Sequence, residues 1–304
     1  MSELIECVPN FSEGRSPATI QKIADAISET PTACVLDHHL DADHNRSVIT
    51  FVADARQVVD AAFRAVKKAA ELIDLRQHRG EHPRLGATDV LPFIPLGDST
   101  MDQCVKLAHQ AGQRISTELS IPVYYYERAA LRSERVNLED VRRGAFELLR
   151  EQIATEPSRI PDAGETRIHE TAGAIIIGAR PFLIAFNCVL ASNDLAIAKQ
   201  IAKTIRARNG GLPFLKALGF RLATKDRVQV SMNLLNYRVT GMADAYNAVQ
   251  REAEKLGVKV ESAEIVGLVP QEALDDSAAY FQTLDPEASS RTLEKRLERC
   301  GLVL

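Results

Sequence analysis

The sequence predicts a mixed α/β (α+β) protein in which one β-α-β-β-α-β unit is used twice. Three observations predict this fold class. Some apolar runs have the two-residue period of strands, others have the three- and four-residue spacing of helices, and both occur in the same order in each half of the 304-residue chain. A β-α-β-β-α-β unit is the ferredoxin-like motif. We therefore expect duplicated ferredoxin-like units that form two subdomains, residues 1–178 and 179–304, with a cleft between them.

The first subdomain begins with a strand and a well-marked helix. Ser16 can cap this helix and Pro17 suits its first turn, while isoleucines follow along one face. A second helix is expected where apolar residues recur at spacings of three and four. The elements expected in this half are, in order, a strand at 4–8, the helix after Ser16, strands at 34–36 and 48–52, a helix at 55–75 and a strand at 90–96.

The second subdomain repeats this order. Its expected elements are a strand at 182–190, a helix near 198–205, paired strands at 216–223 and 228–234, a helix at 242–256 and a strand at 258–266. The strand at 228–234 alternates apolar and polar residues, so one of its faces is polar. Between the halves lie two helical patterns, near 102–119 and 138–153, and a polar linker with Pro and Gly at 156–164.

Composition and charge exclude several classes of protein. The formal net charge of −4 argues against a general nucleic-acid binder, because phosphate affinity needs a basic surface. No apolar run approaches the roughly 20 residues that a membrane span needs, and the N-terminus does not have the pattern of a signal peptide. The five cysteines have no C-x-x-C spacing, and most lie among apolar neighbours. We therefore expect buried thiols in a cytoplasmic protein without membrane contact.

The densest polar stretch, residues 76–89, lies between an expected helix and an expected strand. Its Gly and Pro residues disfavour regular structure, and a loop held by two rigid elements can keep a catalytic side chain both exposed and fixed. His82 lies among arginines, including Arg84, and carboxylates, including Asp89. That setting can hold a neutral imidazole as a proton acceptor. The alternative is a solvated basic loop.

Residues 37–46 form a second polar constellation, with three His and three Asp. They can bind metal, orient a base or form a solvated loop. Asn45 and Arg46 stand at the start of a strand, a suitable place to hold a substrate carboxylate. A zinc site formed by His78 and His82 is not expected, because the metallopeptidase pattern needs a helix that Gly80 and Pro83 disfavour.

A third feature, residues 164–173, is interpreted as a flexible segment between the halves that can close over a ligand. The chain contains no G-x-x-x-x-G-K-S/T loop and no G-x-G-x-x-G after a strand, so nucleotide binding has no support.

At these residues the sequence resembles the formiminotransferase domain family, along essentially the whole chain. The resemblance is carried by Glu6-Cys7-Val8-Pro9-Asn10-Phe11-Ser12-Glu13-Gly14, Asp43-His44-Asn45-Arg46, Gly80-Glu81-His82-Pro83-Arg84, Gly178-Ala179-Arg180, Leu183-Ile184-Ala185-Phe186-Asn187, Gln229-Val230-Ser231-Met232-Asn233-Leu234 and Val266-Gly267-Leu268-Val269-Pro270. The combination is far more specific than any single motif.

The resemblance implies transfer of a formimino group from N-formimino-L-glutamate to N5 of tetrahydrofolate, a step of histidine degradation, by a cytoplasmic homodimer. Tetrahydrofolate is then a co-substrate, and neither a metal nor a tightly bound cofactor is required. His82 matches the catalytic histidine of the family and is expected to act as general base and acid. The folate-contacting stretch matches Gly164, Glu165, Thr166, Arg167, Ile168, His169, Glu170, Thr171, Ala172 and Gly173.

The substrate-binding residues expected around His82 carry either charge or hydrogen-bonding groups. A carboxylate can stabilise the positive amidine, and an arginine can hold a carboxylate of the donor. His39 departs from an acidic residue of the animal form, and Asp41 is a possible substitute. The expected set is Asp37, His39, Asp41, Asn45, Arg46, Arg84 and Asp89.

Three other functions remain open at this point. A relative of the same family can instead close the ring of 5-formyltetrahydrofolate in a salvage reaction. A non-enzymatic ferredoxin-like module can bind RNA or a partner protein, since that fold hosts many functions. A metal hydrolase can be built on His38, His39, His44 and His82.

Overall fold

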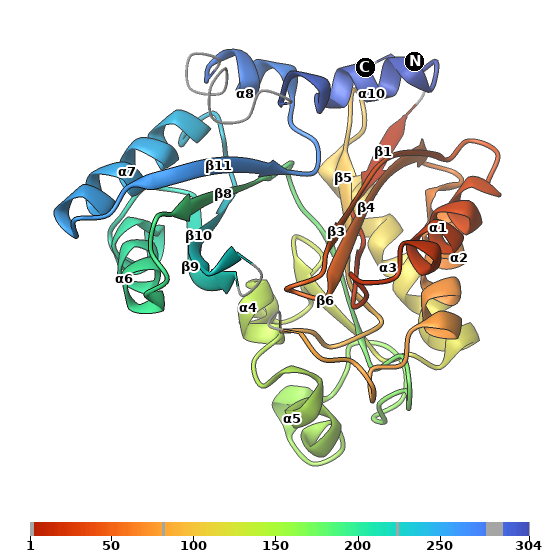
Figure 1. Ribbon diagram of the computed structural model, residues 1–304. Helices are drawn as coiled ribbons and strands as arrows, with labels where there is room; N and C mark the ends of the chain where they lie inside the picture. The colour runs from red at the N-terminus through yellow and green to blue at the C-terminus, as the bar shows by residue number, and fades with distance from the viewer. Residues whose placement is uncertain (1–2, 81–82, 223–224, 278–287, 304) are drawn as a thin grey trace. The chain divides into compact units, whose positions relative to one another are not determined.

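The computed structural model describes residues 3–80, 83–222, 225–277 and 288–303 and divides the chain into two compact units, Met1–Arg180 and Pro181–Leu304. Figure 1 shows that each unit contains its own sheet and helices. The α/β fold class is therefore confirmed. The division at 180 is close to the boundary that we expect at 178, and the cleft between the subdomains stays a prediction.

The first unit is a mixed sheet with helices. Its strands are β1 (Leu4–Cys7), β2 (Asn10–Phe11), β3 (Cys34–Asp41), β4 (Arg46–Asp54), β5 (Thr88–Pro95), β6 (Val123–Glu127) and β7 (Ile175–Ala179). Its α-helices are α1 (Pro17–Ser28), α2 (Val58–Leu72), α3 (Met101–Leu119), α4 (Leu138–Val141) and α5 (Ala145–Gln152), and short 3-10 turns are η1 (Ser133–Arg135) and η2 (Pro157–Arg159). The N-cap of α1 is Ser16, whose side chain accepts from the backbone of Thr19, as its sequence predicts.

Strand pairing in the first unit follows the expected motif and then extends it. β5, β1, β4 and β3 pair in that order, all antiparallel. Beyond β5, the sheet continues through β7 to β6 by parallel pairing. Neither β6 nor β7 is among the elements that the sequence predicts, and the helical pattern at 138–153 is in fact two helices, α4 and α5. Gly144 separates them with a backbone φ of 82°, which a right-handed helix does not admit.

The second unit is a four-stranded antiparallel sheet. Its elements are β8 (Ile184–Leu190), α6 (Leu195–Ile205), η3 (Ala207–Asn209), β9 (Leu215–Leu222), β10 (Arg227–Leu234), α7 (Met242–Lys255), β11 (Val260–Val266), α8 (Gln271–Asp275), η5 (Ala288–Ser290) and α10 (Leu293–Arg299). The strand order β11-β8-β10-β9 is the order that β5, β1, β4 and β3 have in the first unit. This common order supports our interpretation of the fold as a duplicated unit.

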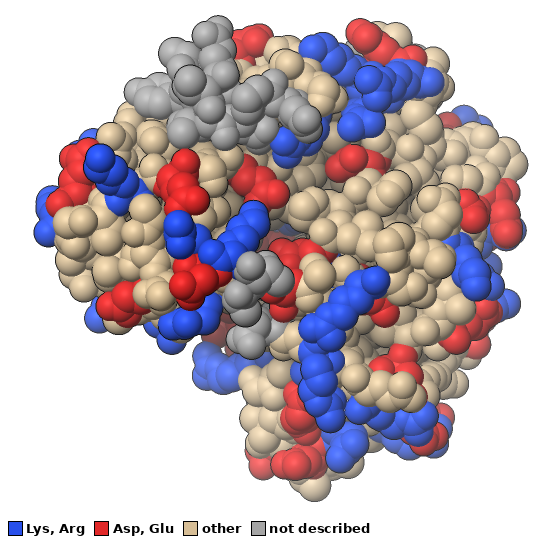
Figure 2. Space-filling model, in the orientation of Figure 1, with Lys and Arg blue, Asp and Glu red and all other residues tan. Residues whose placement is uncertain are grey.

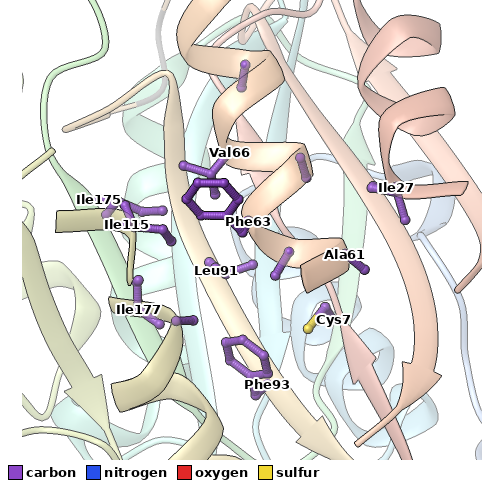
Figure 3. Packing of buried hydrophobic residues seen from close by; sticks show 14 of the residues in the cluster. Cys7, Ile27, Ala61, Phe63, Val66, Leu91, Phe93, Ile115, Ile175 and Ile177 are labelled. Atoms are coloured by element: carbon purple, nitrogen blue, oxygen red, sulfur yellow. The ribbon is translucent and has the colours of Figure 1, made fainter. Parts of the chain in front are cut away.

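The main core of the first unit lies between one face of its sheet and helices α1, α2 and α3. Figure 3 shows Phe63 and Val66 of α2 near Leu91 and Phe93 of β5. Full burial of each such side chain contributes about 1.5–3 kcal/mol. The opposite face of β5, β6 and β7 packs in part on α4 and α5. The sheet is therefore a rigid support from which the loops at its ends project.

Three of the five cysteines agree with the expectation of buried thiols. Cys7, Cys104 and Cys188 are free and buried. On the face in Figure 2, positive and negative side chains of the described residues are interspersed. Within the same residues, no helix has the length and hydrophobicity that crossing a bilayer requires.

Candidate active site in the first unit

Four segments of the first unit meet at one end of its sheet. They are residues 10–14 after β1, the turn at 41–46 between β3 and β4, the loop at 75–87 and the segment at 169–174. Hydrogen bonds join them in pairs: His78 Nε2 lies 2.9 Å from the Asn45 carbonyl oxygen, Ser12 Oγ donates to the Gly86 carbonyl at 2.7 Å, and the Ala87 N–H donates to the Ala172 carbonyl at 2.9 Å. Segments that are far apart in sequence thus form one site.

Asn45 connects three of these segments through its side chain. Its side-chain Oδ1 accepts from the Gly14 N–H at 2.9 Å, and its Nδ2 donates to the Arg79 carbonyl at 2.9 Å. Asn45 has a φ of 48°, in the left-handed region that Asn tolerates better than most residues. One side chain therefore connects the turn to two loops.

Two glycines allow the neighbouring loops to approach the backbone of the turn at 41–46 closely. A Cβ on Gly14 would lie 2.1 Å from the Asp41 carbonyl oxygen, and one on Gly80 would lie 2.4 Å from the His44 carbonyl oxygen. These distances are far below van der Waals contact, so no larger residue fits without a shift of the chain. The glycines of both sequence motifs thus serve close packing of the loops on the turn.

Asp41 and His44 close the turn between β3 and β4. The His44 N–H donates to Asp41 Oδ1 at 2.9 Å, and the ring Nδ1 lies 2.6 Å from Oδ2. Burial acts to raise the pKa of Asp41, but the hydrogen bonds and charge of His44 outweigh it and hold the pKa at about 2. Asp41 is therefore an anion that already has a partner, His44, inside the protein.

The candidates on β3 share one face of the hairpin. Asp37, His39 and Asp41 alternate along the strand, and Asp41 lies opposite Arg46 of β4. Ile49 of β4 points the other way, into the helix-covered core. The sequence-predicted polar residues of the hairpin are thus presented together, away from that core.

Arg46 lies among other charged groups. Burial lowers its pKa to about 10, with a further lowering by the charge of Arg142 and an opposing effect of Asp89 and Asp41. A group with that pKa is still a cation at neutral pH. Arg46 can therefore hold an anionic group of a ligand, as its place at the start of β4 suggests.

Asp89 has a structural reason for its position. The pairing register between β2 and β5 shifts at Asp89, and such an irregularity changes the direction in which a side chain points. The Asp89 carboxylate accepts from the Leu85 N–H at 2.8 Å and forms an ion pair with Arg142. The Asp89 side chain is only 3% exposed, so it organises the loop at 85–89 from within.

Arg84 likewise has a partner within the unit. Its two terminal nitrogens donate to the two carboxylate oxygens of Glu147 at 2.9 and 2.7 Å. This bidentate geometry fixes the plane of the guanidinium. The sequence reasoning missed both Glu147 and Arg142, because their pattern is that of an ordinary helix surface and their partners are more than fifty residues away.

A small cavity of about 10 Å³ lies among these groups. The described residues that line it are Phe11, Ser12, His44, Asn45, Arg46, His78, Arg84 and Asp89. The structure thus brings together four of the predicted substrate-binding residues around one space, while Asp37, His39 and Asp41 are not among those lining it. His78 was considered at the sequence level only as a zinc ligand, and its burial next to the turn was not foreseen.

The predicted folate segment lies against the same loop. Leu75 donates through its N–H to the Thr171 carbonyl at 2.9 Å, and Arg76 forms an ion pair with Glu170 at 2.6 Å. A reciprocal backbone pair joins His169 and Gly173, at 3.1 and 3.0 Å. Residues 169–173 are thus joined to the loop and to each other by hydrogen bonds, whereas Gly164, Glu165, Thr166 and Arg167 are exposed, and the ability of the segment to close over a ligand stays a prediction.

The histidine expected to carry the reaction, His82, lies outside the described residues, as does Glu81. The described parts of the same loop, up to Gly80 and from Pro83, are held by the contacts above. Among the residues with described positions, no group of three or more His, Cys, Asp or Glu side chains is arranged to hold a metal ion.

Comparison with known proteins agrees with the markers in the sequence. The model of the formiminotransferase domain, N-terminal subdomain, matches residues 4–180, and the model of the formiminotransferase domain matches residues 185–298. The chain is 50% identical over 300 residues to a glutamate formimidoyltransferase of Thermoplasma acidophilum, covering 98% of both chains, and 43% identical over 298 residues to one of Streptococcus pyogenes, covering 98% of this chain and 99% of that one. It is also 42% identical over 287 residues to the formimidoyltransferase-cyclodeaminase of Rattus norvegicus, covering 92% of this chain and 53% of that protein. This chain belongs to the formiminotransferase domain family.

Proposed function

We propose that the protein transfers the formimino group of N-formimino-L-glutamate to N5 of tetrahydrofolate, in the degradation of histidine. The observation that carries the proposal is the 50% identity, over 98% of both chains, to a protein named glutamate formimidoyltransferase. Tetrahydrofolate acts as a co-substrate that arrives and leaves in each turnover. No tightly bound cofactor and no metal is part of the proposal.

The chemistry requires one group that can both accept and donate a proton. The N5 amine attacks the amidine carbon, a C–N bond forms, and the attacking nitrogen becomes acidic, so a base must take its proton. The C–N bond to glutamate then breaks, and the leaving amine needs a proton. We assign both steps to His82, because an imidazole near its usual pKa of about 6.5 can serve in each direction.

The cations and hydrogen-bonding groups around the small cavity suit the donor substrate. In the proposal, Arg46 and Asn45 hold a carboxylate of the donor, while Arg84 and Asp89 keep the loop in shape through their pairs with Glu147 and Arg142. On the hairpin face, Asp37 and Asp41, with His39 between them, contribute negative charge that attracts the positive amidine. The folate contacts are assigned to residues 164–173, whose second half is fixed to the loop that bears His82.

A donor comparison tests this function. The purified protein is given tetrahydrofolate and N-formimino-L-glutamate, and the absorbance of the folate product is followed. We expect turnover with this donor and none when 5-formyltetrahydrofolate is supplied alone or with ATP. Turnover of 5-formyltetrahydrofolate without formimino transfer would reject the proposal in favour of the salvage reaction.

The proposal extends to location and assembly. We propose that the protein acts in the cytoplasm as a homodimer and that its first unit, with His82, is the catalytic subdomain. Light scattering on the purified chain tests the dimer: a mass near twice the 33.4 kDa of one chain supports it, and a single-chain mass contradicts it.

A further inference from the structure

A second cavity in the first unit is much larger than the small cavity beside Asn45. Its volume is about 260 Å³, near the lower end of the range of about 300–1,000 Å³ for pockets that take small molecules. It lies between the loop that follows α2, with Leu75, Arg76 and Arg79, and four residues of helix α5 (Figure 1). We call it the α5 cavity. Its size suits one part of a ligand rather than the whole of a large one.

The base of the α5 cavity is apolar. Leu75 and Phe146 line it although they are only 1% and 3% exposed, so they form its inner wall. The ring of Phe146 offers a flat surface on which another aromatic ring can pack. A ligand group that fills this part of the cavity is therefore expected to be aromatic or otherwise apolar.

The rim of the α5 cavity carries three arginines, and one of them already has carboxylate partners. Arg76 forms ion pairs with Asp74 and Glu170, at 2.7 and 2.6 Å. Arg79 and Arg150 are exposed, and neither of them forms an ion pair with any residue whose position is described. A guanidinium in that state can bind a carboxylate of a ligand through two parallel hydrogen bonds.

The acidic residues of the lining do not cancel this charge. The hydrogen bonds from Arg84 to Glu147, with the charges of Arg84 and Arg79, lower the pKa of Glu147, so it is an anion that already has a partner. Glu151 is then the remaining acid of the lining, opposite two arginines without partners, Arg79 and Arg150. The cavity thus combines an apolar base with a positive rim, which suits an aromatic group joined to carboxylates.

The α5 cavity adjoins the parts of the proposed active site. Two of its loop residues are joined to the predicted folate segment at 164–173, one by a backbone hydrogen bond and one by an ion pair. Glu147 lines the α5 cavity, and its partner Arg84 lines the small cavity. In the sequence, His82 lies between Arg79 and Arg84. The loop of the proposed base therefore runs from the lining of one cavity to the lining of the other.

We propose that the α5 cavity binds the p-aminobenzoyl-glutamate part of tetrahydrofolate. The aromatic ring packs on Leu75 and Phe146, and the glutamate carboxylates bind Arg79 and Arg150. This inference rests on the proposed function, and it assigns the tail of the folate to residues outside the segment at 164–173. The donor and the folate then approach the same loop from two separate cavities.

Binding of p-aminobenzoyl-L-glutamate alone, measured by calorimetry, tests the site directly. We expect the affinity of the wild type to fall about 10-fold in Arg150→Gln and further when Arg79→Gln is added, because hydrogen bonds from a cation to the carboxylates are lost. Arg150→Lys keeps the charge and should restore part of the affinity. Arg143→Gln is the matched control: it removes a 75% exposed arginine that precedes α5 and does not line the cavity, so it should bind like the wild type.

Kinetics separate this inference from the proposed function. The KM for tetrahydrofolate is expected to rise about 10-fold in Arg150→Gln, while the KM for formiminoglutamate stays the same, a difference that general loss of structure would not give. If the double variant changes neither the affinity nor this KM by more than about twofold, or if Arg143→Gln has the same effect, the inference is overturned while the proposed function stands. If the wild type binds p-aminobenzoyl-L-glutamate through Arg150 but transfers no formimino group, the proposed function fails and the binding site stands.

Discussion

Replacement of Asn45 by Ala tests how the turn at 41–46 is held in the site. The change removes the bond to the Gly14 N–H and the bond to the Arg79 carbonyl, each worth about 1 kcal/mol net. It also places Ala at a φ of 48°, which costs about 1 kcal/mol more. We therefore expect the free energy of unfolding to fall by about 3 kcal/mol.

Asn45→Gly is the matched control. It loses the same two hydrogen bonds, but glycine adopts the left-handed conformation without strain, so it should be more stable than Asn45→Ala by about 1 kcal/mol. The chain has no Trp, so unfolding in urea is best followed by circular dichroism. Asn45→Ala within about 1 kcal/mol of wild type, or equal in stability to Asn45→Gly, would refute this reasoning.

The remaining stability predictions concern the same turn. The Asp41 carboxylate, with its pKa of about 2, contributes stability that is complete above the unfolded pKa near 4 and is lost as the pH falls from about 4 toward 2. Asp41→Asn should remove this loss, about 1 kcal/mol after allowance for solvent exposure, and an unchanged acid dependence of urea unfolding would contradict the account. Gly80→Ala should cost about 1–3 kcal/mol and reduce transfer, because its Cβ would meet the His44 backbone. In Gly241→Ala the new Cβ would lie no closer than 3.7 Å to the nearest heavy atom, so urea unfolding should change little. Equal losses of stability in the Gly80 and Gly241 variants would exclude the steric explanation.

Local signals in the sequence predicted most of the elements of each unit. Ser16 marked the start of α1, and the spacing of apolar residues predicted α2 and α3. Strands β6 and β7 were missed because they pair in parallel with partners distant in the chain. A short run such as Ile175-Ile176-Ile177, buried on both faces, has no alternation to identify it as a strand.

The site was predictable in its composition but not in its contacts. One cavity is lined by four residues that the sequence analysis selected for their chemistry, namely Asn45, Arg46, Arg84 and Asp89. Their partners could not be inferred, because the ion pair of Asp89 with Arg142 depends on where α4 packs. For the same reason, His78 could be read from the sequence as a metal ligand, whereas its actual partner is a backbone carbonyl, which no sequence pattern shows.

Formimino transfer by the wild type and by His82→Ala is the most direct test of the central claim. The wild type is expected to transfer the group from N-formimino-L-glutamate to tetrahydrofolate. In the variant, turnover should fall about 10²- to 10⁴-fold, the range for loss of a positioned general base, while calorimetry shows unchanged tetrahydrofolate binding. Turnover in His82→Ala equal to that of the wild type would contradict the assignment of proton transfer to this histidine.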